Sequence, residues 1–370
     1  MKVLHIITGL GVGGAELQLR SILQHTQHEA EVLCLYNPGD VAEMIRADGT
    51  PVQNLGMTSN TQVPALWRLW KLIRDGGYDV VHTHLYRACI YGKTAAWLAG
   101  TPVVVATEHS IGETHLERRR MTQGVRALYL ATDKFCDETI AVSDAVATRL
   151  INWGMPARKI SVIPNGVDFQ RVAFDPVQRA KVRAEHGIDD STFVIGVLGR
   201  LDANKRFDLV IEAAAPLLGE KAKLLVVGGG AELENLRAAA GRNQVSQHVV
   251  FAGERHDVAA VLSAFDLFVA ASAQETFGLS VLEALANGLP VLYTTCPALD
   301  GVPTERATRV PGEVGGMRAA MAAEIEFPRV RAEEAEVRRR YGIESVTERI
   351  DELYLRLHQR RSGLAPVGRP

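Results

Sequence analysis

Short runs of apolar and β-branched residues alternate along this chain with longer segments whose apolar positions recur at helical spacing. Strands buried on both faces give such continuous runs, and helices between them produce parallel sheets. The runs fall into two series, so we expect an α/β protein with two doubly wound Rossmann-like domains. The predicted strands are Val3–Ile7, Glu31–Leu35, Val80–His84, Val103–Thr107 and Thr139–Val142, then Phe193–Leu198, Lys223–Val227, Val249–Phe251, Leu267–Ala270 and Pro290–Tyr293.

The two series also set the expected domain limits. In the C-terminal tail, Ile350, Leu353, Tyr354 and Leu357 share one helical face and should pack as an apolar stripe. Ligands of open parallel sheets bind beyond the carboxyl ends of the strands, so two such domains should face each other across a cleft. We predict an N-terminal domain over 1–168, a linker over 169–190, a C-terminal domain over 191–335, a helical tail over 336–361 that returns towards the N-terminal domain, and a disordered end over 362–370.

Composition narrows the function classes. Hydrophobic residues make up 47% and charged residues 23%, as in globular proteins, and the net charge of −2 argues against a nucleic-acid binder. The four cysteines are far apart, which favours free thiols over a disulfide framework or a zinc site. No apolar run approaches the ~20 residues of a membrane span, and the N-terminus is too short for a signal peptide. We therefore expect a cytoplasmic protein.

Two segments leave open whether the protein makes a weak peripheral contact with a membrane. The segment Pro64–Arg74 is amphipathic and carries Trp67 and Trp70. Its positions Leu66, Leu69, Trp70 and Ile73 form an ordinary core stripe, so core packing is favoured. The run Arg118–Arg120 could meet an anionic acceptor or lipid headgroups, but such a run is more often a solvated face. The oligomeric state is not predicted.

The segment Glu275–Glu283 is the most informative stretch. A helix that starts near Gly278 would leave its first N–H groups free for a phosphate, next to Phe277 and Leu279. Glu275 would then lie in the loop before the helix and Glu283 one or two turns inside it. The phosphate site would thus have a carboxylate on each side, Glu275 for a sugar and Glu283 for a ribose. This arrangement suits a nucleotide-sugar.

Three glycine-rich loops follow predicted strands. Gly9, Gly11 and Gly14 nearly give the dinucleotide fingerprint, but no acidic residue ends the next strand, so a nicotinamide dehydrogenase is the least favoured function. This loop is equally consistent with turn chemistry and with a phosphate approach. The turn at Gly228 is explained about as well by helix packing as by a nucleotide. In Gly199–Lys205, the planar Arg200 and the mobile Lys205 could neutralise a diphosphate, or form a solvated basic pair.

Histidines at predicted strand ends offer further polar groups. His109 follows a strand, so it should face the cleft and could bind a sugar hydroxyl, although a lone histidine is more often structural. His82 and His84 have the strand spacing of a metal pair, but no third ligand is evident, so no metal site is predicted. Asn165 and Gly166 also have the composition of a turn.

These motifs resemble those of the retaining GT-B-fold glycosyltransferases of glycosyltransferase family 4, the glycosyl transferases group 1. The resemblance rests on Glu275–Glu283, on Gly13-Gly14-Ala15-Glu16 and on Arg200 with Lys205, and it spans Gly9 to Glu283. It implies a GT-B fold, with donor binding mainly in the C-terminal domain and acceptor binding mainly in the N-terminal domain. It also implies transfer with retention of anomeric configuration.

The resemblance assigns roles residue by residue. It implies that Glu275 binds sugar hydroxyls, Glu283 the ribose, and His109 the far side of the sugar, while Arg200 and Lys205 stabilise the diphosphate. The donor site would also include Gly13, Gly14, Gly199, Gly228, Arg255, Phe277, Gly278 and Leu279, and the acceptor side Glu16, Ser143 and Asn165.

The sequence departs from the family pattern at two places. Arg206 stands where a glycine usually follows the lysine, so this loop should be stiffer or its helix should start differently. The segment Thr294–Pro303 replaces a glycine pair and a glutamate, which leaves the choice of nucleotide base open. No Asp-x-Asp motif occurs, so we expect a metal-independent enzyme without a cofactor, whose diphosphate is held by cations and helix N-termini.

We therefore predict a glycosyltransferase that uses a nucleotide-diphosphate sugar, most readily a UDP-sugar. Its acceptor would be a small-molecule or lipid-linked hydroxyl compound, in glycan, glycolipid or natural-product biosynthesis. A nucleotide-sugar epimerase of the same fold remains an alternative, which activity without any acceptor would reveal. A non-catalytic nucleotide-sugar binding module would bind the donor and turn nothing over.

Overall fold

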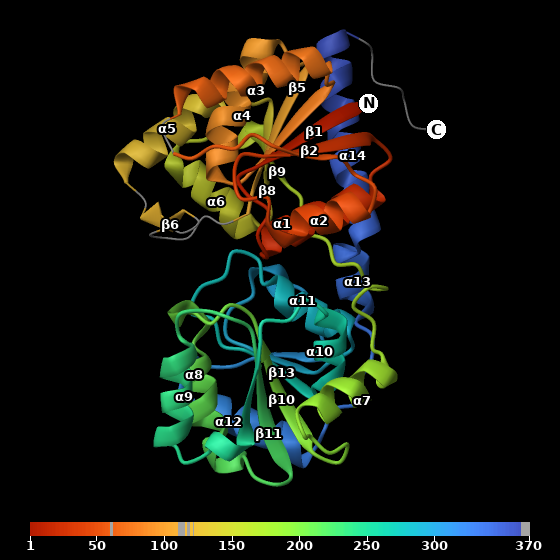
Figure 1. Ribbon diagram of the computed structural model, residues 1–370. Helices are drawn as coiled ribbons and strands as arrows, with labels where there is room; N and C mark the ends of the chain where they lie inside the picture. The colour runs from red at the N-terminus through yellow and green to blue at the C-terminus, as the bar shows by residue number, and fades with distance from the viewer. Residues whose placement is uncertain (60–61, 110–114, 117–118, 121, 364–370) are drawn as a thin grey trace. The chain divides into compact units, whose positions relative to one another are not determined.

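The computed structural model describes residues 1–59, 62–109, 115–116, 119–120 and 122–363. The chain divides into two compact units (Figure 1). The first contains Met1–Gly166 together with the C-terminal segment from Ile343, and the second contains Val167–Gly342. The segment predicted as a linker, 169–190, belongs to the second unit and contains a helix. The end of the chain, 364–370, and Arg118 lie outside the described residues.

The first unit is built on a seven-stranded parallel sheet in the order β3-β2-β1-β4-β5-β8-β9. An antiparallel pair of two-residue strands, β6 and β7, stands apart from it. The strands are β1 (Lys2–Ile7), β2 (Glu29–Cys34), β3 (Val52–Asn54), β4 (Val80–His84), β5 (Val103–Glu108), β6 (His115–Leu116), β7 (Arg119–Arg120), β8 (Glu138–Ala141) and β9 (Ile160–Val162).

Helices cover both faces of this sheet. Alternate residues of β1 point to opposite faces, so Leu4 and Ile6 pack with α3 and α4, while Val3 packs with α14. Helix α14, blue in Figure 1, lies beside the strands of this unit. The helices are α1 (Gly14–His25), α2 (Gly39–Ala47), α3 (Val63–Gly76), α4 (Tyr86–Ala99), α5 (Gln123–Asp133), α6 (Asp144–Trp153), α14 (Ile343–Ser362) and the short 3-10 helix η1 (Ala157–Lys159).

The second unit has a six-stranded parallel sheet in the order β12-β11-β10-β13-β14-β15. Its strands are β10 (Phe193–Leu198), β11 (Ala222–Val227), β12 (Val249–Gly253), β13 (Leu267–Ala270), β14 (Val291–Tyr293) and β15 (Ala307–Arg309). Its helices are α7 (Pro176–Glu185), α8 (Phe207–Ala214), α9 (Leu233–Arg242), α10 (Val258–Ala264), α11 (Leu279–Ala286), α12 (Val314–Glu326) and α13 (Ala335–Tyr341), with 3-10 helices η2 (Ala203–Lys205), η3 (Ala215–Leu217), η4 (Ser246–His248) and η5 (Pro297–Leu299).

Both sheets agree with the predicted fold class, and each of the ten predicted strands is present. Three strands of the two sheets were not predicted, namely β3, β9 and β15. Each has three residues and lies at an edge of its sheet. An edge strand pairs on one side only and is partly exposed, so its sequence lacks the continuous apolar run of a central strand.

The predicted apolar stripes pack as expected. Ile350, Leu353, Tyr354 and Leu357 of α14 are all buried in the core of the first unit. In α3, Leu69 and Ile73 are buried and Leu66 and Trp70 are partly buried, whereas Trp67 is 64% exposed. All four cysteines are free and buried. Among the helices in the described part of the chain, none is both long and apolar enough to cross a bilayer.

Candidate functional site

Helix α11 begins at Leu279, as the sequence predicted. The residue before it, Gly278, caps the helix with φ +99° in the left-handed region. A Cβ atom at this position would lie 2.5 Å from Sγ of Cys296, so only glycine fits. No acceptor in the described residues takes the backbone N–H groups of Leu279 and Ser280. Two backbone donors at the positive end of a helix dipole form a site suited to an anion.

An ion pair stands beside this helix start. The Nζ atom of Lys205 lies 2.6 Å from Oε1 of Glu275, and the Ser272 hydroxyl donates to the same oxygen at 2.8 Å. Both charged side chains are partly buried. The loops that carry them follow β10 and β13, which are neighbours in the sheet. The amide of Asn204 ties the loops together by donating to the carbonyl oxygen of Gln274.

Lys205 and Glu275 had separate predicted roles, and their pairing was not predicted. They are 70 residues apart, and only the strand order brings them together. The strand order of a doubly wound sheet was the available signal, since its first and fourth strands lie side by side.

Arg200 lies on the same edge of the sheet. Its side chain is exposed, and no partner for its guanidinium occurs among the described residues. Gly199 precedes it, and a Cβ there would lie 3.6 Å from Cε of Lys205, so the lysine stem passes over this glycine. A Cβ on Gly228 would lie 1.9 Å from the carbonyl oxygen of Gly199. Gly228 is therefore required for packing between the two loops, whereas the sequence had suggested packing against a helix or an approach to a nucleotide.

Glu283, which was predicted to bind the ribose, projects from α11. It is partly buried, and no described donor hydrogen-bonds its carboxyl group. Burial raises the pKa of Glu283 from its ordinary value of 4.5 to about 7, and the positive charge of Arg171 opposes this shift. A carboxylate without donors in a desolvated position is suited to accept hydrogen bonds from a ligand such as a diol.

Two other predicted donor residues are engaged elsewhere in the second unit. The ring of Phe277 is 3% exposed and packs edge-on against Tyr341, so only its backbone can reach a ligand. The guanidinium of Arg255 binds Asp257 through two nitrogens and Glu185 through a third contact. These hydrogen bonds raise the pKa of Arg255. Its donors are therefore largely occupied without a nucleotide.

The glycine loop of the first unit leads into α1. Gly13 is the N-cap residue, and a Cβ there would lie 2.4 Å from a carboxylate oxygen of Glu16. The Glu16 side chain thus folds back over the cap, as the acid of a capping box does. Gly14 is the first helical residue and is exposed. Ser143 caps α6, where its hydroxyl accepts from the backbone N–H of Val146 at 3.3 Å.

His109 lies inside the first unit. It is 7% exposed, and its Nε2 atom lies 3.2 Å from Nδ1 of His84. Burial lowers the pKa of His109 to about 4, while a hydrogen bond with the Asn165 side chain acts in the opposite direction. The ring is therefore neutral near pH 7, and its Nε2 atom is directed at a second buried imidazole.

His5 was not among the site residues predicted from the sequence. In the register of β1 and β4, His5 pairs with His82, and strand alternation places His84 on the same face. The ligand atoms of these three buried histidines all lie within 4.8 Å of one another. A third imidazole, which was not evident from the sequence, is thus present. However, His82 already contacts the Tyr354 hydroxyl at 2.5 Å and the Thr107 hydroxyl at 2.7 Å. The available signal was the strand order of a doubly wound sheet, in which the first and fourth strands are neighbours.

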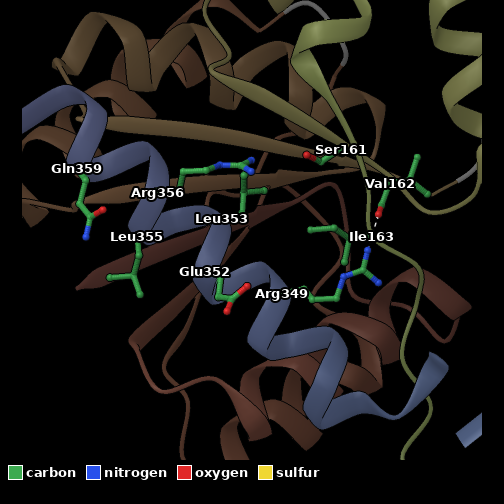
Figure 2. A pocket seen from close by; sticks show the side chains of 9 residues that line it. All are labelled: Ser161, Val162, Ile163, Arg349, Glu352, Leu353, Leu355, Arg356 and Gln359. Carbon is green, nitrogen blue, oxygen red and sulfur yellow. Dashed lines mark hydrogen bonds between the residues drawn. The ribbon is translucent and has the colours of Figure 1, made fainter. Parts of the chain in front are cut away.

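A separate hollow of about 450 Å³ lies on the first unit between β9 and α14 (Figure 2). Arg349 and Arg356 project along it from α14, and Arg349 donates to the carbonyl oxygen of Val162 at 2.7 Å. None of the residues predicted for the site lines this hollow.

Comparison with known proteins adds independent information. Residues 12–171 match the family described as Glycosyltransferase Family 4, and residues 178–326 match Glycosyl transferases group 1. A GDP-mannose-dependent alpha-mannosyltransferase of Mycobacterium tuberculosis is 30% identical over 295 residues, which are 76% of this chain and 74% of that protein. The UDP-Gal:alpha-D-GlcNAc-diphosphoundecaprenol alpha-1,3-galactosyltransferase of Escherichia coli is 27% identical over 294 residues, or 77% of this chain and 76% of that protein.

A solved structure agrees with the observed fold. The crystal structure of Anabaena Alr3699/HepE in complex with UDP and glucose superposes with a TM-score of 0.85 and 24% sequence identity. The superposition covers 96% of this chain and 100% of that one. At this identity the likeness concerns the fold, which is two α/β domains with parallel sheets.

Proposed function

This chain is a glycosyltransferase of family 4 with the GT-B fold, and we propose that it transfers a sugar from a UDP-sugar to a hydroxyl acceptor with retention of anomeric configuration. The observation that carries the proposal is the cluster at the start of α11. There, two free backbone donors stand next to the Lys205–Glu275 ion pair, and Glu283 lies further along the same helix. An anion site flanked by two carboxylates matches a nucleoside diphosphate joined to a sugar.

Binding of the donor would separate Lys205 from Glu275. In the proposed complex, Lys205 turns to the diphosphate and Glu275 accepts hydrogen bonds from sugar hydroxyls. Glu283 accepts from the ribose diol. Because Lys205 and Glu275 neutralise each other without a ligand, neither is a buried unpaired charge before the donor arrives.

The proposed reaction exchanges one C–O bond for another. The bond between the anomeric carbon and the diphosphate breaks, and the acceptor oxygen bonds to that carbon on the same face. The proton of the acceptor hydroxyl passes to the leaving phosphate. Arg200, Lys205 and the α11 N-terminus would stabilise the charge that grows on the diphosphate, so the step needs no metal ion.

The first unit would supply the acceptor side. The family relatives include an enzyme named for UDP-galactose and a lipid-linked diphosphate acceptor, and one named for GDP-mannose. We propose a UDP-sugar and an acceptor that is either lipid-linked or a small molecule. Glu16, Ser143 and Asn165 would lie near this acceptor, and His109 near the far side of the sugar.

A donor screen tests the proposal. UDP-glucose, UDP-galactose, UDP-N-acetylglucosamine and GDP-mannose would each be incubated with mixed hydroxyl acceptors, and products would be identified by mass spectrometry and anomeric NMR. We expect a product with the donor's anomeric configuration from a UDP-sugar, and none from Glu275→Gln. An inverted product, or a donor epimerised without any acceptor, would contradict the proposed reaction.

Chelation separates the metal-independent mechanism from a metal-assisted one. Turnover should persist in excess EDTA, because the protein's own cations and the helix N-terminus carry the diphosphate charge. The assay is repeated after addition of magnesium or manganese. A complete loss of turnover that either metal reverses would refute the role given to Arg200 and Lys205.

A further inference from the structure

Three buried histidines of the first unit form a linear chain of hydrogen bonds. Nδ1 of His5 lies 3.1 Å from Nε2 of His84, and Nδ1 of His84 lies 3.2 Å from Nε2 of His109. The Asn165 side chain acts on His109 as well, since it opposes the lowering of the His109 pKa by burial. His5, His84 and His109 are 1%, 0% and 7% exposed, so no water competes along most of the chain.

The contacts run head to tail, and this restricts where the protons lie. A neutral imidazole has one N–H donor and one bare nitrogen acceptor. Each nitrogen-to-nitrogen contact therefore needs one proton, supplied by one of its two rings. If His5 donates from Nδ1, then His84 must accept at Nε2 and donate from Nδ1 to His109. If His109 donates from Nε2, the whole order is reversed. The three rings must then be all Nδ1–H or all Nε2–H.

We propose that His5 and His84 are positioning residues, and that their shared tautomer with His109 fixes the orientation and the proton position of the His109 ring for sugar transfer. This role rests on the proposed function, which places His109 and Asn165 beside the substrates. In the all-Nδ1–H state the Nδ1 atom of His109 carries a hydrogen, and in the all-Nε2–H state it is a bare acceptor. The buried chain thus decides whether Nδ1 of His109 offers a donor or an acceptor.

Burial also keeps the chain neutral. It lowers the pKa of His5 to about 3 and that of His84 well below the usual range, and neighbouring imidazoles act in the same direction. His84 uses both ring nitrogens in the chain, so a second proton on this ring would place two protons at one of its contacts. The shared tautomer is therefore stable through the range in which a free histidine titrates.

A metal ion is the competing explanation for clustered histidines. His5 and His84 each use one ring nitrogen for the hydrogen bond between them. His82 uses both of its ring nitrogens for hydrogen bonds with Tyr354 and Thr107. A metal would have to replace these hydrogen bonds. The hydrogen-bonded chain accounts for the observed contacts without such a replacement.

The tautomers can be measured without any substrate. In full-length protein labelled with ¹⁵N-histidine, protonated and bare ring nitrogens have separate NMR signals, which single substitutions assign. At pH 7 we expect His5, His84 and His109 to be neutral and to share one tautomer. Different tautomers among the three, a doubly protonated ring, or a stoichiometric metal found by elemental analysis would overturn the proposal.

Substitutions test the positioning role. An asparagine amide can stand in for Nδ1 of His5, whereas leucine cannot. We expect His5→Leu to lower kcat by about tenfold, since small misplacements near reacting groups are costly, and His5→Asn to restore most of the loss. The probes are UDP-galactose, UDP-glucose and GDP-mannose with the acceptor found in the donor screen. Equal kcat for the two folded variants would contradict the positioning role.

His84→Asn and His82→Asn form the matched pair. Both residues are buried on β4, but His82 is bonded to Tyr354 and Thr107 and is outside the chain. His84→Asn should lower kcat and alter the tautomer of His109, while His82→Asn should lower stability only. If His84→Asn does not fold, the two His5 variants still test the positioning role. If no donor gives a product, the proposed function is refuted. The NMR measurement needs no substrate, so it would still test the shared tautomer.

Discussion

At the scale of single residues, Glu283 combines a cost to stability with a proposed gain in binding. Its pKa of about 7 lies above the ordinary 4.5, so the folded protein holds a proton between these values that the unfolded chain releases. Stability from this group is therefore present at low pH and is lost as the pH rises through 7. Residues that bind ligands commonly carry such a penalty.

The first prediction concerns Glu283→Gln. The variant should be more stable than the wild type at pH 8, measured by urea denaturation with circular dichroism, and should bind UDP more weakly by about 1.5–3 kcal/mol. Affinity of the wild type should rise about tenfold more than that of the variant between pH 6 and pH 8, because the carboxylate form accepts the ribose hydrogen bonds. Titration of the UDP phosphate changes the affinity of both proteins alike, so the comparison with the variant removes this effect. Equal pH dependence in the two proteins would remove Glu283 from the site.

The second prediction concerns the two cations. Arg200→Ala and Lys205→Ala should each lower kcat by about 100- to 1000-fold, with smaller effects on binding of the intact donor, because charge on the diphosphate grows as its bond breaks. The double variant should lose less than the product of the single losses. Arg242→Ala, a substitution at an exposed position of α9, is the control. A folded variant with normal turnover would show that its residue is only a surface charge.

At the scale of elements, the junction between η2 and α8 shows how a departure from the family pattern is accommodated. Arg206 has φ +49° in the left-handed region, where glycine is favoured. The helix still starts at Phe207, so the chain keeps the turn and accepts backbone strain. The Arg206 guanidinium donates to the carbonyl oxygen of Gly312 at 2.9 Å, which offsets part of the cost.

The third prediction isolates this strain. Arg206→Ala removes the guanidinium contact and keeps a Cβ, whereas Arg206→Gly removes both. The glycine variant should be more stable than the alanine variant by about 1 kcal/mol, the usual cost of a left-handed non-glycine residue. Urea denaturation of both proteins measures the difference. A less stable glycine variant would mean that flexibility of the unfolded chain outweighs the strain.

At the scale of the whole molecule, the buried histidines make one unit sensitive to acid. Burial lowers the pKa of His5, His82, His84 and His109 below the ordinary 6.5. The unfolded chain therefore binds more protons than the folded unit below pH 6.5. Their contribution to stability is complete above that pH and falls as the pH drops towards 4.

The fourth prediction is a steep loss of stability of the first unit between pH 6.5 and pH 5. Each histidine should contribute a slope of about 1.4 kcal/mol per pH unit, and His5→Asn should remove one such share. All four tryptophans lie in the first unit, so tryptophan fluorescence during urea denaturation follows that unit selectively. A free energy of unfolding that stays constant over this pH range would contradict the buried neutral rings.

The two-sheet α/β architecture could be predicted from the sequence, because central parallel strands must be apolar on both faces and their runs are visible without any contact information. The start of α11 could also be predicted, since Gly278 and the residues around it follow local backbone rules. The segment 169–190 has a polar, proline-containing composition typical of a linker, yet Arg183 of α7 is buried there and binds Asp266. That interaction depends on a residue 83 positions away.

The polar side chains that meet could be identified only from the folded arrangement of the strands. Lys205 pairs with Glu275 because β10 and β13 are neighbours in the sheet, and His5 meets His84 because β1 and β4 are. Strand order and register arise from the packing of the whole unit, and hydrophobic periodicity along one strand does not encode them. The same reason explains the missed edge strands, whose partners lie elsewhere in the sequence. Local pattern thus specified the elements, and long-range pairing specified the chemistry at their ends.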